Sequence, residues 1–275
     1  MNKKLICGVA LLAIVQIGKA QTGINPNDIM DGINVYGDNF GESGTARFLG
    51  MGGSMGALGG DLSAVEINPA GLGVFRNSEA NISLGVSSNK NKASMGGSSY
   101  SNTDTNFNVP SIGFVLALGN DADPLKVNLG VNYSYQRLDN DVIFPQNKNI
   151  NLLYPDVNGV DQVYAMDAYE QYTNGYKSKM KFSLATNYDD RIYFGLGLDW
   201  HYLNVDRNVL YSQRSTVDGE LMTFNQQFTP YSQDANGFGL TVGVIGKVTP
   251  EIRLGAAYHS PVWWSDINYD YIAYD

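Results

Sequence analysis

The sequence predicts an all-β fold: the first half of a transmembrane antiparallel β-barrel, about seven strands, with an N-terminal glycine-rich helical hatch. Three observations support this prediction. Apolar residues alternate with small or polar ones in several segments, short and long connections follow one another in turn, and residues 43–76 are rich in glycine but do not alternate. Charged residues make up only 16% of the chain, which contains 31 glycines and 18 tyrosines. The net charge of −9 argues against a nucleic-acid partner.

Residues 1–20 have the layout of a secretory signal peptide. A basic start precedes an apolar stretch at residues 5–17, which is too short to cross a bilayer as a helix. Cys7 is the only cysteine, so the exported chain would have no thiol for a disulfide, a metal site or a nucleophile. We expect a signal peptide at residues 1–20, an N-terminal extension and hatch at 21–77, and the barrel at 78–275, located in the bacterial outer membrane.

The glycine-rich stretch at residues 43–76 predicts a plug. Apolar residues recur every three or four positions, as on one face of a helix; they are Phe48, Met51, Met55, Leu58, Leu62 and Val65. Interior helical glycines cost roughly 1 kcal/mol each relative to alanine, so such a helix needs surrounding walls. Asp61 or Ser63 can cap a second short helix, and Asn68 should end it because a residue before proline avoids the helical conformation.

Seven segments predict membrane strands. The clearest is Arg191–Leu203, in which every second residue is large and apolar and the residues between are small or polar. A tilted membrane strand needs about 10 residues. The other segments are Glu79–Ser87, Phe107–Leu118, Lys126–Gln136, Lys179–Tyr188, Asn236–Val248 and Ile252–His259. The apolar phase of the second segment switches around Pro110, which predicts a bulge or kink there.

The connections separate a barrel from a β-sandwich, which would explain the alternation alone. Short connections at 119–125, 189–190 and 249–251 are interleaved with long ones at 88–106, 138–177 and 204–235. Short periplasmic turns with long external loops are typical of outer-membrane barrels. Tyrosine and tryptophan near strand ends predict interfacial girdles; they are Tyr133, Tyr135, Tyr188, Trp200, Tyr202, Tyr258, Trp263 and Trp264. An odd strand count predicts the N-terminal half of a longer barrel, a monomer when full length.

Two stretches carry a resemblance to a known family. GMGGSMGALGGDLSAVEINPAGLGVFR resembles the N-terminal hatch of the FadL-type outer-membrane transporters of long-chain fatty acids and other hydrophobic compounds, and LGAAYHSPVWW is similar to one of their mid-barrel strands. The resemblance implies that the Asn-Pro-Ala motif lies in the hatch along the substrate path. It therefore assigns substrate passage to Asn68, Pro69, Ala70 and the adjoining Gly71. An inward kink in an early strand forms a lateral opening in that family, and Pro110 is the candidate here.

The function implied by the resemblance is passive uptake of hydrophobic compounds such as fatty acids, with outer-membrane lipid and lipopolysaccharide around the barrel. We expect no enzymatic activity, cofactor or metal. Two alternatives remain: a haem or haemin receptor, with His201, His259 or tyrosines as axial ligands, and a structural or adhesive barrel that acts through its loops. A structural barrel needs no glycine-rich plug. Asp156, Asn158 and Asp161 resemble a loose calcium loop but lack EF-hand spacing, and we interpret them as solvated.

Overall fold

The computed structural model describes residues 43–119, 123–155, 158–217, 219–225, 231–265 and 268–271. These residues belong to one compact unit, Asp38–Asp275. The predicted signal peptide and the extension up to residue 42 lie outside the described residues. Within the described ranges, the helices are all too short or too polar to cross a membrane.

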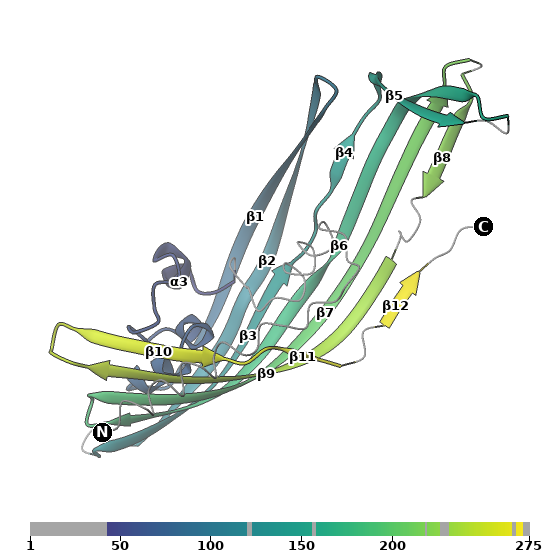
Figure 1. Ribbon diagram of the computed structural model, residues 1–275. Helices are drawn as coiled ribbons and strands as arrows, with labels where there is room; N and C mark the ends of the chain where they lie inside the picture. The colour runs from purple at the N-terminus through teal and green to yellow at the C-terminus, as the bar shows by residue number, and fades with distance from the viewer. Residues whose placement is uncertain are drawn as a thin grey trace, which may run out of the picture. The chain divides into compact units, whose positions relative to one another are not determined.

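The described chain forms one antiparallel sheet that curls into a half-barrel (Figure 1). Neighbours along the main path of this sheet are, in order, β1 (Glu79–Met95), β2 (Ser98–Leu118), β3 (Leu125–Arg137), β6 (Asp161–Tyr188), β7 (Ile192–Ser215), β9 (Tyr231–Lys247) and β10 (Arg253–His259). The predicted order of seven main strands in a curved antiparallel sheet is therefore confirmed.

The prediction of long loops is largely wrong, because the strands continue through them. The β1–β2 hairpin stays paired from Ser87↔Asn106 to Met95↔Ser98. Short strands extend the sheet further; they are β4 (Val142–Phe144), β5 (Asn147–Pro155), β8 (Leu221–Asn225), β11 (Trp263–Trp264) and β12 (Asn268–Tyr271). The β1–β2 hairpin, β5 and β8 project well beyond the curled part of the sheet (Figure 1). In the β1–β2 hairpin beyond Ser87 the sequence is mostly polar on both faces, so backbone pairing continues there without the alternation that reveals a strand in sequence.

The two faces of the sheet differ as the alternation predicts. Along β7, the even-numbered residues from Ile192 to Trp200 are 41–61% exposed, whereas Tyr193 and Asp199 are 2% exposed. We call the face that contacts residues 43–76 the inner face and the opposite one the outer face. The outer face is a continuous apolar surface over these residues, and the inner face is small or polar.

The glycine-rich segment, residues 43–76, is only partly helical. It contains one α-helical turn, α3 (Ala46–Gly50), and two 3₁₀ helices, η1 (Leu62–Glu66) and η2 (Pro69–Val74). The predicted continuous helical face from Phe48 to Val65 is wrong, because the glycines between α3 and η1 adopt positive φ angles that end a helix; they are Gly52, Gly53, Gly59 and Gly60. Asp61 rather than Ser63 caps η1, and its Oδ1 accepts a hydrogen bond from the backbone N–H of Ser63 at 2.8 Å.

The segment shares a hydrophobic core with the sheet. Residues of η1, η2 and their flanks pack with residues of β2 and β6 in one buried cluster; its members are Leu62, Val65, Leu72, Phe75, Val115 and Ala185. The segment is thus held by apolar burial as well as by the polar contacts described below.

Candidate functional site

The turn at Asn68 joins η1 to η2 and fixes the segment to two strands of the sheet. The Asn68 side chain is 1% exposed. Its Oδ1 accepts a hydrogen bond from the backbone N–H of Ala70 at 3.0 Å, which caps η2. Its Nδ2 donates to the backbone oxygens of Gly56 at 2.8 Å, Val244 at 3.2 Å and Ala256 at 3.4 Å. One amide therefore ties the segment to itself and to β9 and β10.

Glycines on the inner face make room for this turn. Gly195 and Gly243 are direct cross-strand partners on β7 and β9. A Cβ atom at Gly195 would lie 2.2 Å from the backbone N of Ala70 and the backbone C of Pro69. A Cβ atom at Gly243 would lie 1.9 Å from Asn68 Oδ1. Two further inner-face glycines lie against the segment: a Cβ atom would be 2.8 Å from Leu72 Cδ1 at Gly130 and 2.5 Å from the Gly56 backbone oxygen at Gly255. The sheet thus has a recess that fits the Asn-Pro-Ala turn and no added side chain.

The predicted hatch residues Asn68, Pro69, Ala70 and Gly71 lie together in this recess, and all four are buried. Gly71 lies against Gly59, where a Cβ atom would be 3.1 Å from the Gly59 Cα. The middle of the glycine-rich segment therefore folds onto a part near its end, at a point where neither backbone has room for a side chain.

Glu66 of η1 binds a set of donors on the inner face. Its Oε1 accepts hydrogen bonds from Asn132 Nδ2 at 2.7 Å and Ser134 Oγ at 3.0 Å, both on β3. Its Oε2 lies 2.7 Å from the Nζ of Lys179 on β6. Burial opposes ionisation, but the ammonium groups of Lys179 and Lys181 and these hydrogen bonds outweigh it and lower the Glu66 pKa from 4.5 to about 2. Glu66 is therefore ionised at neutral pH.

A second ion pair lies beside the first. Lys181 Nζ is 2.9 Å from Asp199 Oδ1 and donates to Thr241 Oγ1 at 3.1 Å, linking β6, β7 and β9. The Lys181 side chain is 0% exposed. His201, two positions after Asp199 on the same face, is buried and packs edge-on against Trp264, with ring centroids 5.8 Å apart.

The end of the segment is fixed by β3 and by the β6–β7 turn. Asn128 Nδ2 donates to the backbone oxygens of Leu72 and Phe75, each at 2.8 Å. Arg76, the residue after this anchor, lies 3.7 Å from Asp190 in the turn. The chain therefore leaves the inner face at a defined position before β1 begins.

Pro110 lies at the predicted irregularity, away from the recess. The register of β1 and β2 shifts between Ser83 and Gly85, and the extra residues opposite this shift are Val109 and Pro110. A bulge is thus present where the sequence predicted one. The backbone oxygen of Pro110 accepts a hydrogen bond from Ser43 Oγ, so the bulge contacts the start of the glycine-rich segment.

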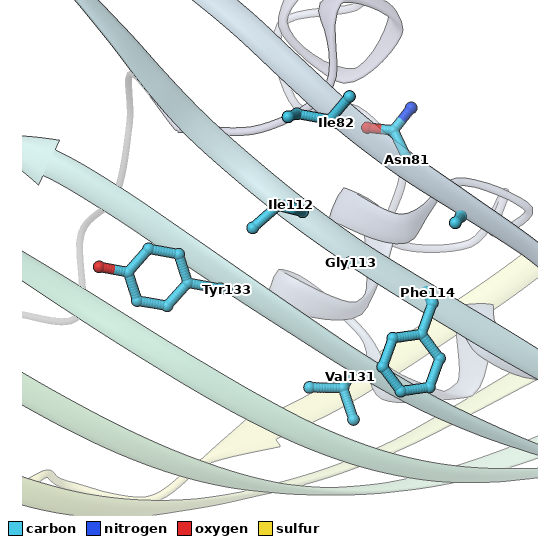
Figure 2. A pocket seen from close by; sticks show the side chains of 8 residues that line it. Asn81, Ile82, Ile112, Gly113, Phe114, Val131 and Tyr133 are labelled. Atoms are coloured by element: carbon cyan, nitrogen blue, oxygen red, sulfur yellow. The ribbon is translucent and has the colours of Figure 1, made fainter.

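An apolar groove lies on the outer face just below this bulge. Its volume is about 510 Å³. Figure 2 shows Ile112 and Phe114 of β2 between Ile82 of β1 and the residues Val131 and Tyr133 of β3. These side chains all belong to the outward phase of their strands, so the groove opens away from the glycine-rich segment.

The structure gives no geometric support to a metal site in the part of the chain that it describes, where no three His, Cys, Asp or Glu residues gather. His259 Nε2 lies 2.9 Å from the backbone oxygen of Ile67. Asp156 lies outside the described residues, and Asp161 is an exposed residue at the start of β6.

Sequence reasoning missed several residues of this site. No role was predicted for Glu66, Lys179 or Lys181 from the sequence. The signal that could have found the lysines is their phase, because both lie on the inner side of a strand whose alternate residues are apolar. The positions of Gly195 and Gly243 on the inner face could have been predicted from their phase in the same way.

The chain matches no family model, no curated protein and no solved structure. The chain is therefore described by its fold alone, as a curled antiparallel half-barrel with a glycine-rich segment docked on a polar inner face.

Proposed function

We propose that this chain is the N-terminal half of an outer-membrane β-barrel of the FadL type that takes up hydrophobic compounds passively, with residues 43–76 as its hatch. The observation that carries the proposal is the fit between the Asn68-Pro69-Ala70 turn and the recess at Gly195 and Gly243. A sheet with one apolar face does not need to be filled in this way. A barrel that must be closed at rest and open to a ligand does.

The outer face supports a membrane location. The exposed outward residues of β7 run from Ile192 through Trp200, and Tyr202 follows in the same phase. Ten steps of about 3.3 Å, tilted by about 40°, cover about 25 Å, the height of the apolar band of outer-membrane barrels. Tyr202 stands next to Tyr176, and Tyr176 next to Tyr135, with ring centroids 5.7 and 5.4 Å apart. This row matches an aromatic girdle at the external end of the band.

The bulge at Pro110 supports a lateral exit for apolar ligands. It disturbs the pairing of β1 and β2 at the level of the outer groove formed by Ile82, Ile112 and Phe114. An apolar molecule that leaves the barrel there enters the hydrocarbon of the membrane directly and avoids the polar periplasm. The contact of Ser43 with Pro110 links this position to the hatch.

The proposal is tested by uptake. The full-length gene product, expressed in an outer membrane that lacks fatty-acid transporters, should give saturable uptake of labelled oleate above that of the empty envelope. Asn68→Ala combined with Pro69→Ala should lower this uptake at equal surface level, because the hatch loses its cap and its ties to β9 and β10.

The matched control is Asn77→Ala, because Asn77 is exposed just beyond the hatch. This variant should take up oleate at the parental rate, and a small hydrophilic solute should report any general leak. Oleate uptake no higher than that of the empty envelope, with the protein present at the surface, would reject the transport proposal. If the Asn68 and Pro69 variant takes up oleate at the parental rate, the Asn-Pro-Ala motif only fills space and has no role in transport.

A further inference from the structure

The hairpin of β1 and β2 continues the outer face of the sheet beyond its apolar part. Along β1 the outward residues Leu84 and Val86 are 66% and 72% exposed, and Phe107, the cross-strand partner of Val86, is 65% exposed. The next large side chains in the outward phase of β1 are those of Lys90 and Lys92. The outer face of β1 therefore changes from apolar to basic along a single strand.

The hairpin does not neutralise these two lysines. Both side chains are exposed, and neither has an ion-pair partner among the described residues. Asp104 of β2 is the cross-strand partner of Asn89, so it belongs to the alternate phase and lies on the other side of the hairpin. The Cα atoms of Lys90 and Lys92 are about 7 Å apart along the strand, so one anionic group between the two long side chains can contact both.

The outer face is not basic all around the half-barrel. On β7 and β9 the outward residues beyond the apolar part include Asp206 and Asp234. Arg137, outward on β3, forms an ion pair with Asp139. The chain as a whole has a net charge of −9 and therefore repels anions. An anionic partner is attracted to the outer face at β1 and not at β7 and β9.

The two lysines lie at the height of lipid head groups. Lys90 follows Val86 by four residues, which is about 10 Å along the membrane normal for a strand tilted by about 40°. Lipid head groups occupy roughly 5–8 Å beyond the hydrocarbon on each side of a bilayer. A lysine stem can bend back over apolar surface while its ammonium group stays in polar surroundings. Both ammonium groups can therefore reach the head groups of the outer leaflet, with Val86 and Phe107 directly below them.

We propose that Lys90 and Lys92 bind a phosphate group of a lipopolysaccharide molecule in the outer leaflet, and that one acyl chain of this lipid lies against Val86 and Phe107. This inference rests on the outer-membrane location proposed above but not on transport. Lysine binds phosphate as a point charge, and two lysines on one face hold one phosphate between them. A lipid without phosphate makes only the apolar contact, and a free phosphate ion makes only the charged one. Neither binds as tightly as the whole lipid.

Binding of lipid A to the purified full-length gene product in a non-ionic detergent tests this proposal. The probes are lipid A with its phosphate groups, the same lipid A after removal of these groups, and inorganic phosphate. Lys90→Gln combined with Lys92→Gln should weaken binding of the phosphorylated form roughly thirtyfold at low salt and less at high salt. Binding of the dephosphorylated form should not change, and Lys90→Arg combined with Lys92→Arg should keep the parental affinity. Asp104→Asn, on the opposite side of the same hairpin, is the matched control and should not weaken binding.

A second measurement uses the unaltered protein and does not depend on how the variants fold. Saturating phosphorylated lipid A should protect residues 86–94 from amide hydrogen exchange and leave residues 204–210 unchanged, and inorganic phosphate should protect neither segment. Equal affinity for the two forms of lipid A, parental affinity in the double glutamine variant, or equal protection of both segments would overturn the site. A protein that is inserted in the outer membrane would then keep its proposed location without this site, whereas a full-length product absent from the outer membrane would reject both.

Discussion

Replacing Gly195 by alanine tests whether the hatch needs the recess in β7. On a free strand this change is favourable, because glycine inside a strand costs roughly 0.5–1 kcal/mol relative to alanine. In this structure the new methyl group would lie 2.2 Å from backbone atoms of Pro69 and Ala70. Backbone atoms held by a proline and a cap cannot move aside as a flexible side chain would. Gly195→Ala should therefore stabilise the strand by itself but destabilise the docked hatch.

The magnitude follows from overpacking. Forcing extra methyl groups into a packed core typically costs about 1–3 kcal/mol and occasionally more. Because the Gly195 contact is with backbone, we expect about 3 kcal/mol against docking of the hatch, which increases its undocked population roughly a hundredfold. Gly246→Ala on β9 is the matched control, because a Cβ atom there has no neighbour within 4 Å. This control should leave docking unchanged.

Hydrogen exchange of residues 62–74 in the full-length protein measures the docked fraction, and leak of a small hydrophilic solute reports the open lumen. Gly195→Ala should increase both at unchanged barrel abundance, and Gly246→Ala should increase neither. If Gly195→Ala keeps the parental protection from hydrogen exchange, the recess does not hold the turn, and this reasoning is refuted.

Two further predictions concern the hatch anchor and the β6–β7 turn. Because the Glu66 pKa is lowered, ionised Glu66 stabilises the docked hatch by about 3 kcal/mol above pH 4.5, and this contribution is lost as the pH falls from 4.5 towards 2. Protection of the hatch from amide hydrogen exchange should therefore be constant from pH 7 to 5 and fall below pH 4.5. Glu66→Gln should make this protection less dependent on pH. Asp189 in the β6–β7 turn has a φ of 52°, an angle that glycine adopts readily and a β-branched residue does not. Asp189→Val should therefore destabilise the hairpin by about 1–2 kcal/mol in urea unfolding, and Asp189→Gly should not. Equal unfolding midpoints for the two variants would contradict the turn geometry.

The sequence was informative where one face of a strand is apolar and the other is not. Arg191–Leu203 alternates without a break, and β7 indeed begins at Ile192. The same strand continues to Ser215, far beyond the predicted end. Beyond Leu203 the outer-phase residues become polar, as at Asn204, Asp206 and Asn208, whereas Val205 and Val209 of the inner phase are buried. The register is maintained there by pairing with β6, as at Tyr169↔Tyr211. A search for alternation with a large apolar outer face therefore ends before the strand does.

In the hatch, the sequence pattern predicted more regular structure than the chain forms. Its glycines predicted tight packing correctly, but the apolar spacing from Phe48 to Val65 predicted a helix that does not form. The spacing is satisfied instead by short helical turns whose apolar side chains reach two separate clusters, with Phe48 and Met55 in one and Leu62 and Val65 in the other. Glycines adopt positive φ angles between these turns, which lets the chain change direction and reach both clusters.

The contacts of Glu66 with the sheet could not be predicted from the sequence for a different reason. Glu66 and Lys179 are far apart in the chain, and neither lies in a motif with fixed spacing. What brings them together is the pairing of β3 with β6, which sets Asn132 opposite Lys181, together with the docking of η1 over both strands. Phase alone indicates that a lysine points inward, but a buried ammonium group requires a partner. That partner lies in the sheet itself for Lys181, which pairs with Asp199, and in the glycine-rich segment for Lys179, which pairs with Glu66. An inward lysine on a strand with an apolar outer face therefore predicts an acidic partner, but strand pairing and the docking of η1 decide which one.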